Sequence, residues 1–178
     1  MNLEIILLAD DIVSSINNNL DYLIKIIPEI KPMIGFDHKH PHHHLDVWNH
    51  TLLALSFSPN DFGIRLTLLL HDIGKPFSYI EGEVRHFKNH PKVSAIMSNN
   101  ILKRLSYDEE YIKYICFLIE NHDNPISDEL INNNYELSLK LFEVQKCDAL
   151  AHHPDKLEKR KKYINDINNK LILNKKKY

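Results

Sequence analysis

The segment DFGIRLTLLLHDIGKP, residues 61–76, decides the fold of this chain. Apolar residues occupy all sides of a helix drawn through 61–71, which is typical of a helix in the centre of a domain. That helix ends in an ionisable pair, His71 and Asp72, and Gly74 stops it directly afterwards. Burying such a pair is unfavourable unless a partner or a cation compensates for the lost hydration. We therefore expect a buried polar site at the end of a central helix.

Helical periodicity also dominates the rest of the chain, and strand signals are nearly missing. Prolines, glycines and candidate N-cap residues separate the helical patterns. The expected helices cover about 3–30, 46–55 with Asp46 as N-cap, 61–71, 90–105, 108–121, 136–151 and 154–173, with a loop over 74–88. The predicted fold class is all-α, as a single-domain bundle of about seven helices over residues 1–178.

The charge balance argues against a surface that is basic throughout. The chain has 178 residues and a formal net charge of −2, whereas nucleic-acid binders often carry a strong positive excess. Small phosphorylated substrates or a local basic patch remain open. The late basic run is interpreted as a solvated helix face and tail, with an RNA contact as the alternative. This run comprises Lys156, Lys159, Arg160, Lys161, Lys162 and Lys175 to Lys177.

Cysteine usage and the N-terminus indicate a protein of the cytoplasm. Cys116 and Cys147 lie in apolar helical patterns without metal-binding spacing, so we expect buried, reduced thiols. The apolar run 5–9 is interrupted by Asp10 and Asp11, and no basic segment precedes it. It therefore fits neither a signal peptide nor a membrane span.

Histidine is the unusual residue of this composition, with 12 copies against four glycines. A neutral imidazole is the commonest metal ligand in proteins, so this excess favours a metal site. The cluster over 38–44 is compatible with such a site, but also with an exposed loop of no chemical purpose. It lies in mid-chain directly before a helix, which argues against an expression tag.

Further ionisable residues recur on the apolar faces of other expected helices. His50 shares a face with Val47, and Asp148 shares one with Val144, so each needs a buried partner. His90 opens one helix and His122 closes another, positions at which a surface or capping histidine is the commoner role. Together with His71 and Asp72, these residues form a His/Asp set that suits a divalent transition-metal ion.

The order His50, His71-Asp72, Asp148 resembles the HD superfamily of metal-dependent phosphohydrolases. The sequence around these residues is similar to the HD domain of bacterial CCA-adding tRNA nucleotidyltransferases. The blocks that carry this resemblance are Pro28-Glu29-Ile30 through His42, Asp46-Val47-Trp48-Asn49-His50-Thr51, Leu68 to Pro76, Phe87-Lys88-Asn89-His90 and Lys146 to His152. The resemblance implies that His50, His71, Asp72 and Asp148 are metal ligands.

In relatives with two metals, histidines placed like His90 and His122 bind the second ion, and the aspartate of the pair bridges both. The resemblance therefore implies one or two ions, and iron, manganese, nickel and zinc all accept a His/Asp set. Asp72 would orient the attacking water, and Lys75 would bind the phosphate, although a surface lysine after a helix stop is the alternative. His42 and Asp46 resemble substrate-binding positions, or are a loop residue and a cap. His152 and His153 are interpreted as surface residues or supports of the ligands.

The predicted activity is hydrolysis of a phosphomonoester or cyclic phosphodiester of a nucleotide or RNA-derived substrate by metal-activated water. We expect a stand-alone HD domain without a nucleotidyltransferase domain, so nucleotide addition to tRNA is not carried over. The alternative is a metal-stabilised module that binds RNA or a protein without turnover. A degenerate domain is disfavoured, because every expected ligand is present. A membrane partner is not expected, and the sequence leaves the oligomeric state open.

Overall fold

The computed structural model describes residues 2–40 and 44–175, with Lys156 described by its backbone only. Within these residues the fold is all-α, as predicted, and no β-strand occurs. The helices are α1 Leu3–Leu7, α2 Ile12–Asn18, α3 Leu20–Ile26, η1 Pro28–Met33, α4 Val47–Ser56, α5 Phe62–Leu70, α6 Lys75–Ser78, α7 His90–Arg104, α8 Glu109–Asn121, α9 Asp128–Asn133, α10 Tyr135–Leu150, η2 Pro154–Lys156 and α11 Leu157–Lys175. Elements η1 and η2 are 3-10 helices.

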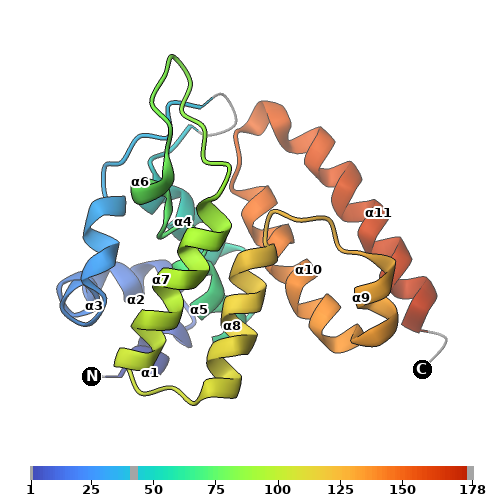
Figure 1. The fold of residues 1–178 in the computed structure, drawn as a ribbon, viewed down its shortest axis with the longest axis horizontal. Helices are drawn as coiled ribbons and strands as arrows, with labels where there is room; N and C mark the ends of the chain where they lie inside the picture. The colour runs from blue at the N-terminus through green and yellow to red at the C-terminus, as the bar shows by residue number, and fades with distance from the viewer. Residues whose placement is uncertain (1, 41–43, 176–178) are drawn as a thin grey trace.

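Helix α5 forms the centre of the fold, as its sequence predicts. Every residue from Gly63 to Leu70 is buried, and α1, α4, α8 and α10 all pack against the helix. Asp61 caps its N-terminus by accepting a hydrogen bond from the backbone N–H of Ile64. The buried Arg65 donates to the carbonyls of Leu7 and Ala9, which ties the N-terminal segment to the central helix. The C-terminal end of α5 thus lies deep in the molecule (Figure 1).

The expected single helix over 3–30 is wrong, because this region forms α1, α2, α3 and η1. Asp11 starts a new helix by accepting from the backbone N–H of Ser14, so the chain turns between α1 and α2. Pro28 and Pro32 lack the N–H that an α-helix needs, and the chain around them adopts a 3-10 helix. This splitting accounts for half of the excess over seven helices, and α6, α9 and η2 account for the other half.

The expected loop over 74–88 contains the short helix α6 and a projecting hairpin-like turn, in which Ile80 pairs with His86. Gly74 allows α6 and α7 to approach closely here. A Cβ at Gly74 would lie 2.6 Å from the backbone nitrogen of Ser94, and the Gly74 N–H donates to the Ser94 hydroxyl. The glycine after the His-Asp pair is therefore required by packing rather than by its φ angle.

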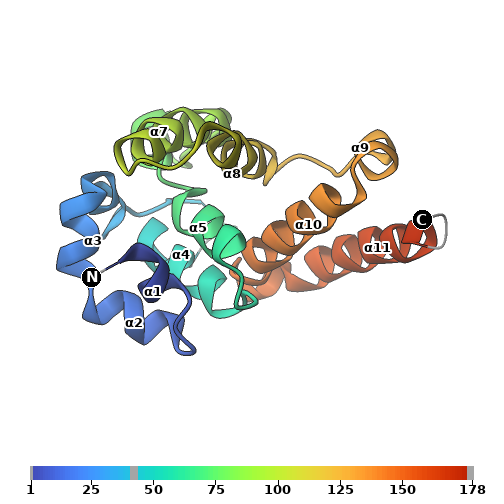
Figure 2. The same ribbon diagram turned by 90° about the horizontal axis from the view of Figure 1, so that it is seen from below.

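Helices α9, α10 and α11 lie on one side of the molecule (Figure 2). They enclose a second apolar cluster, which includes Leu118, Ile131, Leu141 and Ile167. Helix α9 was not expected from the sequence; Ser127 caps it by accepting from the Leu130 N–H. Helix α10 belongs to both halves, because Val144 and Cys147 pack into the main core.

Both cysteines are free thiols, but only Cys147 is fully buried. Cys116 is half-buried and its thiol donates to the Ala95 carbonyl, so the expectation of two buried thiols holds for one of them. No helix in the described part of the chain is both long and apolar enough to cross a membrane.

Candidate metal centre

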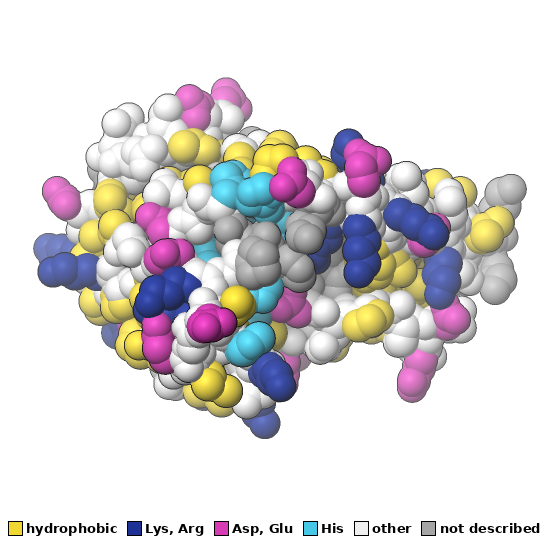
Figure 3. Space-filling view, turned by 90° about the horizontal axis from the view of Figure 1, so that it is seen from above, with side chains coloured by type: hydrophobic (Ala, Val, Ile, Leu, Met, Phe, Trp, Pro, Cys, Tyr) yellow, Lys and Arg dark blue, Asp and Glu magenta, His cyan; other side chains and the backbone are white. Residues whose placement is uncertain are grey.

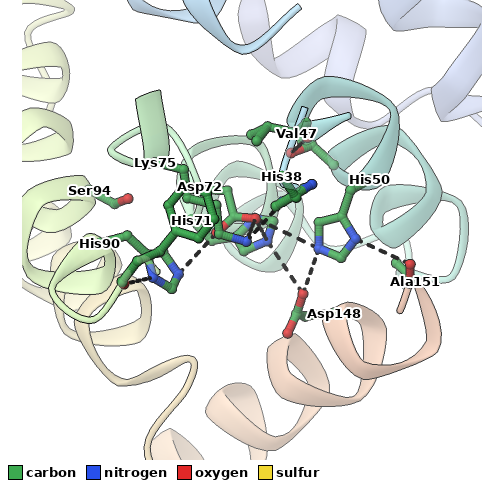
Figure 4. A network of polar contacts seen from close by, with 12 residues as sticks. His38, Val47, His50, His71, Asp72, Lys75, His90, Ser94, Asp148 and Ala151 are labelled. Atoms are coloured by element: carbon green, nitrogen blue, oxygen red, sulfur yellow. Dashed lines mark hydrogen bonds and ion pairs between the residues drawn. The ribbon is translucent and has the colours of Figure 1, made fainter. Parts of the chain in front are cut away.

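Four of the predicted ligands converge from three helices. His50 comes from α4, His71 and Asp72 from the end of α5, and Asp148 from α10, and all four are buried (Figure 4). His50 Nε2 lies 2.8 Å from Asp148 Oδ1 and 3.7 Å from Asp72 Oδ2. His71 Nε2 lies 3.3 Å from Asp72 Oδ2 and 3.6 Å from Asp148 Oδ1. Residues almost 100 positions apart in the sequence thus form one polar cluster.

His90 and His122 complete a second group around the same aspartate. His90 Nε2 lies 3.1 Å from Asp72 Oδ1, and His122 Nε2 lies 3.8 Å from that oxygen. The two Nε2 atoms are 3.2 Å apart, and both residues are buried rather than on the surface. The geometry gives two possible metal-binding groups, His50-His71-Asp72 and Asp72-His90-His122, which share Asp72.

Backbone carbonyls fix the tautomer of all four histidines. Each Nδ1 lies within hydrogen-bond distance of one backbone carbonyl. The pairs are His50 with Ala151, His71 with Leu68, His90 with Phe87 and His122 with Ile119. A carbonyl can only accept, so each Nδ1 carries a proton, and Nε2 is the atom that presents a lone pair to the centre when the ring is neutral. Protein ligands of metals are commonly oriented in this way.

Polar atoms of the described residues face one another in this centre without a donor between them. His71 Nε2 and Asp72 Oδ1 are buried and form no hydrogen bond with any described residue. His50 Nε2 faces a carboxylate oxygen, and the Nε2 atoms of His90 and His122 face each other. Acceptors facing acceptors at such distances repel unless a proton or a cation lies between them. The donors present therefore fit a divalent metal ion.

Electrostatics keeps the carboxylates ionised. Burial acts to raise the pKa of Asp72, but His71 and Lys75 outweigh it and hold this pKa well below its usual range. The pKa of Asp148 is likewise held well below its usual range, since His152 and His50 outweigh burial. Burial lowers the pKa of His71, but Asp72 and Asp148 outweigh this and raise it to about 10. The centre therefore favours a positive charge between its carboxylates.

A family model described as the HD domain matches residues 42–167, which is most of the chain. The chain belongs to the HD-domain family. The residues that the sequence predicts as metal ligands of such a domain are among those that converge here.

Several curated proteins are similar to part of this HD domain. The CC-adding tRNA nucleotidyltransferase of Thermus thermophilus is 29% identical over 111 residues, 58% of this chain and 25% of that protein. The A-adding tRNA nucleotidyltransferase of Deinococcus radiodurans is 34% identical over 123 residues, 61% of this chain and 28% of that protein. The Multifunctional CCA protein of Shewanella denitrificans is 28% identical over 116 residues, 63% of this chain and 26% of that protein. The HD domain chain spans about a quarter of the length of these relatives.

Lys75 of the HD domain is buried, which removes the surface-lysine interpretation. Its ammonium donates to Asp72 Oδ2 at 2.7 Å and lies 5.7 Å above the centroid of the Phe87 ring. Helix α6 begins at Lys75, so the turn at Gly74 carries this charge back to the carboxylate of the His-Asp pair.

His38 is a site residue that the sequence did not single out from the histidine cluster. It is buried, its Nδ1 donates to the Leu45 carbonyl, and its Nε2 accepts from the Lys75 ammonium at 3.2 Å. Burial and the adjacent Lys75 lower the pKa of His38 to about 2, so the imidazole stays a neutral acceptor. His38 thus orients Lys75.

His152 supports the centre from α10's C-terminal turn. It is buried, its Nδ1 donates to the Asp148 carbonyl, and its ring packs edge-on against His50. This agrees with a supporting role rather than a surface position. His153 is only partly exposed and lies 3.5 Å from Asp155, away from the metal-binding groups.

The two remaining predicted substrate-binding residues are not placed at the centre. His42 lies outside the described residues. Asp46 caps α4: its Oδ1 accepts from the Asn49 backbone at 2.7 Å and its Oδ2 from the Asn49 side chain at 2.9 Å. The capping prediction for Asp46 is confirmed, and substrate binding by either residue stays a prediction.

Two adjoining cavities open beside the centre. The first, of about 250 Å³, lies over it and is lined by Lys75, His90, His122, Asp148 and further residues of the 86–88 segment. The second, of about 360 Å³, runs between α10 and α11. Histidine side chains gather near the middle of this face, and basic side chains follow on the α11 side (Figure 3). Three of the predicted ligands, His90, His122 and Asp148, therefore line these cavities.

Proposed function

We propose that this HD domain is a metal-dependent phosphohydrolase. Its substrate would be a phosphomonoester or cyclic phosphodiester of a nucleotide or RNA-derived molecule. One observation carries the proposal: a single buried carboxylate, Asp72, lies at the junction of two histidine groups and also holds a buried lysine. The candidate metal ligands and a buried cation thus lie together beside a cavity that Lys75, His90 and His122 line.

In this proposal His50, His71, Asp72 and Asp148 hold one divalent ion, and His90, His122 and Asp72 hold a second. Imidazole and carboxylate ligands suit iron, manganese, nickel or zinc. Such ions supply Lewis-acid activation of a phosphoryl oxygen and of an attacking water. The backbone carbonyls behind each imidazole contribute by fixing ligand direction before any ion arrives.

The chain's own residues then act on the phosphoryl group. Asp72, ionised and fully buried, orients the attacking water through its carboxylate. Lys75 supplies a positive charge that stabilises the charge developing on the phosphoryl oxygens. His38 keeps the Lys75 ammonium directed toward Asp72 rather than toward solvent. Burial strengthens both interactions, since the local dielectric is low.

The nucleotide part of the proposal is supported by the relatives and by the cavity. Two of the similar curated proteins are named as tRNA nucleotidyltransferases. The cavity of about 360 Å³ beside the centre is within the size range of small-molecule sites. A binding module for RNA is the second candidate, favoured by exposed Lys159, Lys161 and Lys162 along α11.

The proposal is tested by a substrate panel. Purified protein is supplied in turn with manganese, nickel, iron(II) or zinc. Hydrolysis of 2′,3′-cyclic AMP, 2′-AMP and p-nitrophenyl phosphate is followed by chromatography. Turnover that disappears on chelation and in His71→Ala, but survives in His153→Ala, supports the enzyme. If metal binds and no substrate turns over with any ion, the binding module takes its place; salt-sensitive RNA binding lost on charge reversal of Lys159, Lys161 and Lys162 would then support it.

A further inference from the structure

The cavity between α10 and α11 adjoins the cavity over the centre, but the hydrolysis proposed above assigns no role to the residues that line the rest of it. It shares His122, Asp123, Asp148 and Arg160 with the cavity over the metal-binding groups. Its far walls are built by other residues, from the segment after α8 and from the first turns of α11. A ligand whose reacting end lies at the centre would therefore extend into this cavity.

Tyr163, Pro125 and Ala149 give this cavity an apolar lining, and the Tyr163 side chain is held in place by a hydrogen bond. The Tyr163 hydroxyl donates to Gln145 Oε1 at 2.8 Å, and Gln145 Nε2 donates to the carbonyls of Asn121 and Asn124. These polar atoms are thus already paired, and the ring they fix is available as a surface. Aromatic rings held in this way stack with nucleobases.

The α11 side of the cavity carries positive charge without a protein counter-ion. Lys159 and Arg160 line the cavity, and neither forms an ion pair with a described residue. Other lysines of the same helix do have partners, since Lys161 pairs with Glu158 and Lys170 with Asp128. Arg160 lies, like Asp123 and Asp148, where this cavity meets the one over the centre, whereas Lys159 lines the cavity between α10 and α11. Positive charge is thus present at the junction of the two cavities and along the α11 wall.

We propose that this cavity binds the nucleoside of the substrate against Tyr163, while Arg160, assisted by Lys159, binds a second phosphate. The preferred ligands are nucleotides that carry a phosphate besides the one at the centre, as in a nucleoside bisphosphate. The inference rests on the proposed hydrolase, whose substrate class it narrows. Arg160 is suited to the task because its guanidinium binds phosphate oxygens in pairs.

The test compares two ligands that differ by one phosphate. Affinities of manganese-loaded protein for 2′-AMP and adenosine 2′,5′-bisphosphate are measured by calorimetry. The wild type is expected to bind the bisphosphate roughly tenfold more tightly, the gain typical of a charge-assisted phosphate contact. Arg160→Ala is expected to remove this preference and Arg160→Lys to keep part of it. Lys162→Ala, the matched control on the same helix outside the cavity, is expected to keep all of it.

A second pair of variants tests the wall. Tyr163→Ala is expected to weaken both ligands by roughly 5- to 100-fold through the lost stacking surface, while Tyr163→Phe retains most of the affinity. The proposal is overturned if the wild type binds the two ligands equally. It is overturned equally if Arg160→Ala keeps the preference, or if Lys162→Ala loses it, because the effect would then come from the general basic charge of α11.

Hydrolysis of p-nitrophenyl phosphate by the same wild-type sample separates the two proposals. Turnover without a preference for the bisphosphate would support the proposed hydrolase activity and contradict the proposed nucleotide site. A preference for the bisphosphate that depends on Arg160, without turnover of any substrate, would support the nucleotide site and contradict the hydrolase activity.

Discussion

His90 and His122 direct their Nε2 atoms at each other across 3.2 Å, although both imidazoles carry their proton on the opposite nitrogen. Their lone pairs repel unless a cation lies between them and the shared Asp72. We therefore expect two divalent ions per chain at saturation. His122→Ala should bind one ion and keep the group around His71. Metal content after dialysis against manganese checks both numbers.

The control for this prediction is His153→Ala, which removes a histidine outside both groups and should keep two ions. A wild type that never exceeds one ion per chain, or a His122→Ala variant that still binds two, would show that His90 and His122 do not form a second site.

His38 should act on catalysis only through Lys75. Loss of its imidazole leaves the Lys75 ammonium without one of its acceptors, and misplaced groups cost rate steeply. We expect His38→Ala to lower kcat/KM roughly 10- to 100-fold with bound metal unchanged. Lys75→Ala should cost about 100-fold or more. The double variant should be no worse than Lys75→Ala alone, because the two residues act as one unit. Additive losses would assign His38 a separate role.

Gly74→Ala should destabilise the fold through contact rather than through backbone strain. The added Cβ would lie 2.6 Å from the Ser94 backbone nitrogen, so α6 and α7 must move apart. Overpacking of this kind costs about 1–3 kcal/mol. Urea unfolding measures the loss. As a control, Gly35→Ala adds a Cβ that meets no atom within 4 Å, although its positive φ is itself strained. An unfolding free energy of Gly74→Ala equal to that of the wild type would contradict the packing described here.

The ion pair of Asp61 with Lys140 should make stability depend on acid. Partial burial acts to raise the pKa of Asp61, but Lys140 and the capped Ile64 N–H outweigh it and lower the pKa. A pKa lowered by folding means that the ionised carboxylate stabilises the native state above its unfolded pKa. That stability is lost as the pH falls through the folded pKa. Asp61→Asn, which still caps α5, should be about 0.5–1 kcal/mol less stable near pH 7.

The same difference should shrink as the pH falls through the lowered pKa of Asp61 in the folded protein, because the wild-type carboxyl then becomes protonated. Urea unfolding of both proteins across this range measures it. A constant difference at every pH would assign the effect to the cap rather than to the charge.

Local sequence could predict the helices that pack with one apolar face and the ligands they carry. The apolar stripes of these helices carry or adjoin four ionisable residues, His50, His71, Asp72 and Asp148. Because such residues need a partner when they are buried, their positions predict a shared site. His38 gave no such signal, because its role depends on a loop reaching Lys75 from 37 residues away. Arg160 looked like one charge in a solvated run, since nothing local distinguishes it from Lys162. The helix α9 is a six-residue element, too short for its periodicity to stand out.

Asp72→Asn is the decisive variant for the metal centre, because Asp72 belongs to both candidate metal-binding groups and also pairs with Lys75. The substitution keeps the shape and removes the charge. Metal content and hydrolysis of 2′,3′-cyclic AMP are measured on the same sample, with circular dichroism to show that the fold persists. We predict loss of both ions and a fall in kcat/KM on the order of 10³-fold or more. A folded Asp72→Asn protein that keeps its ions and its turnover would contradict the account.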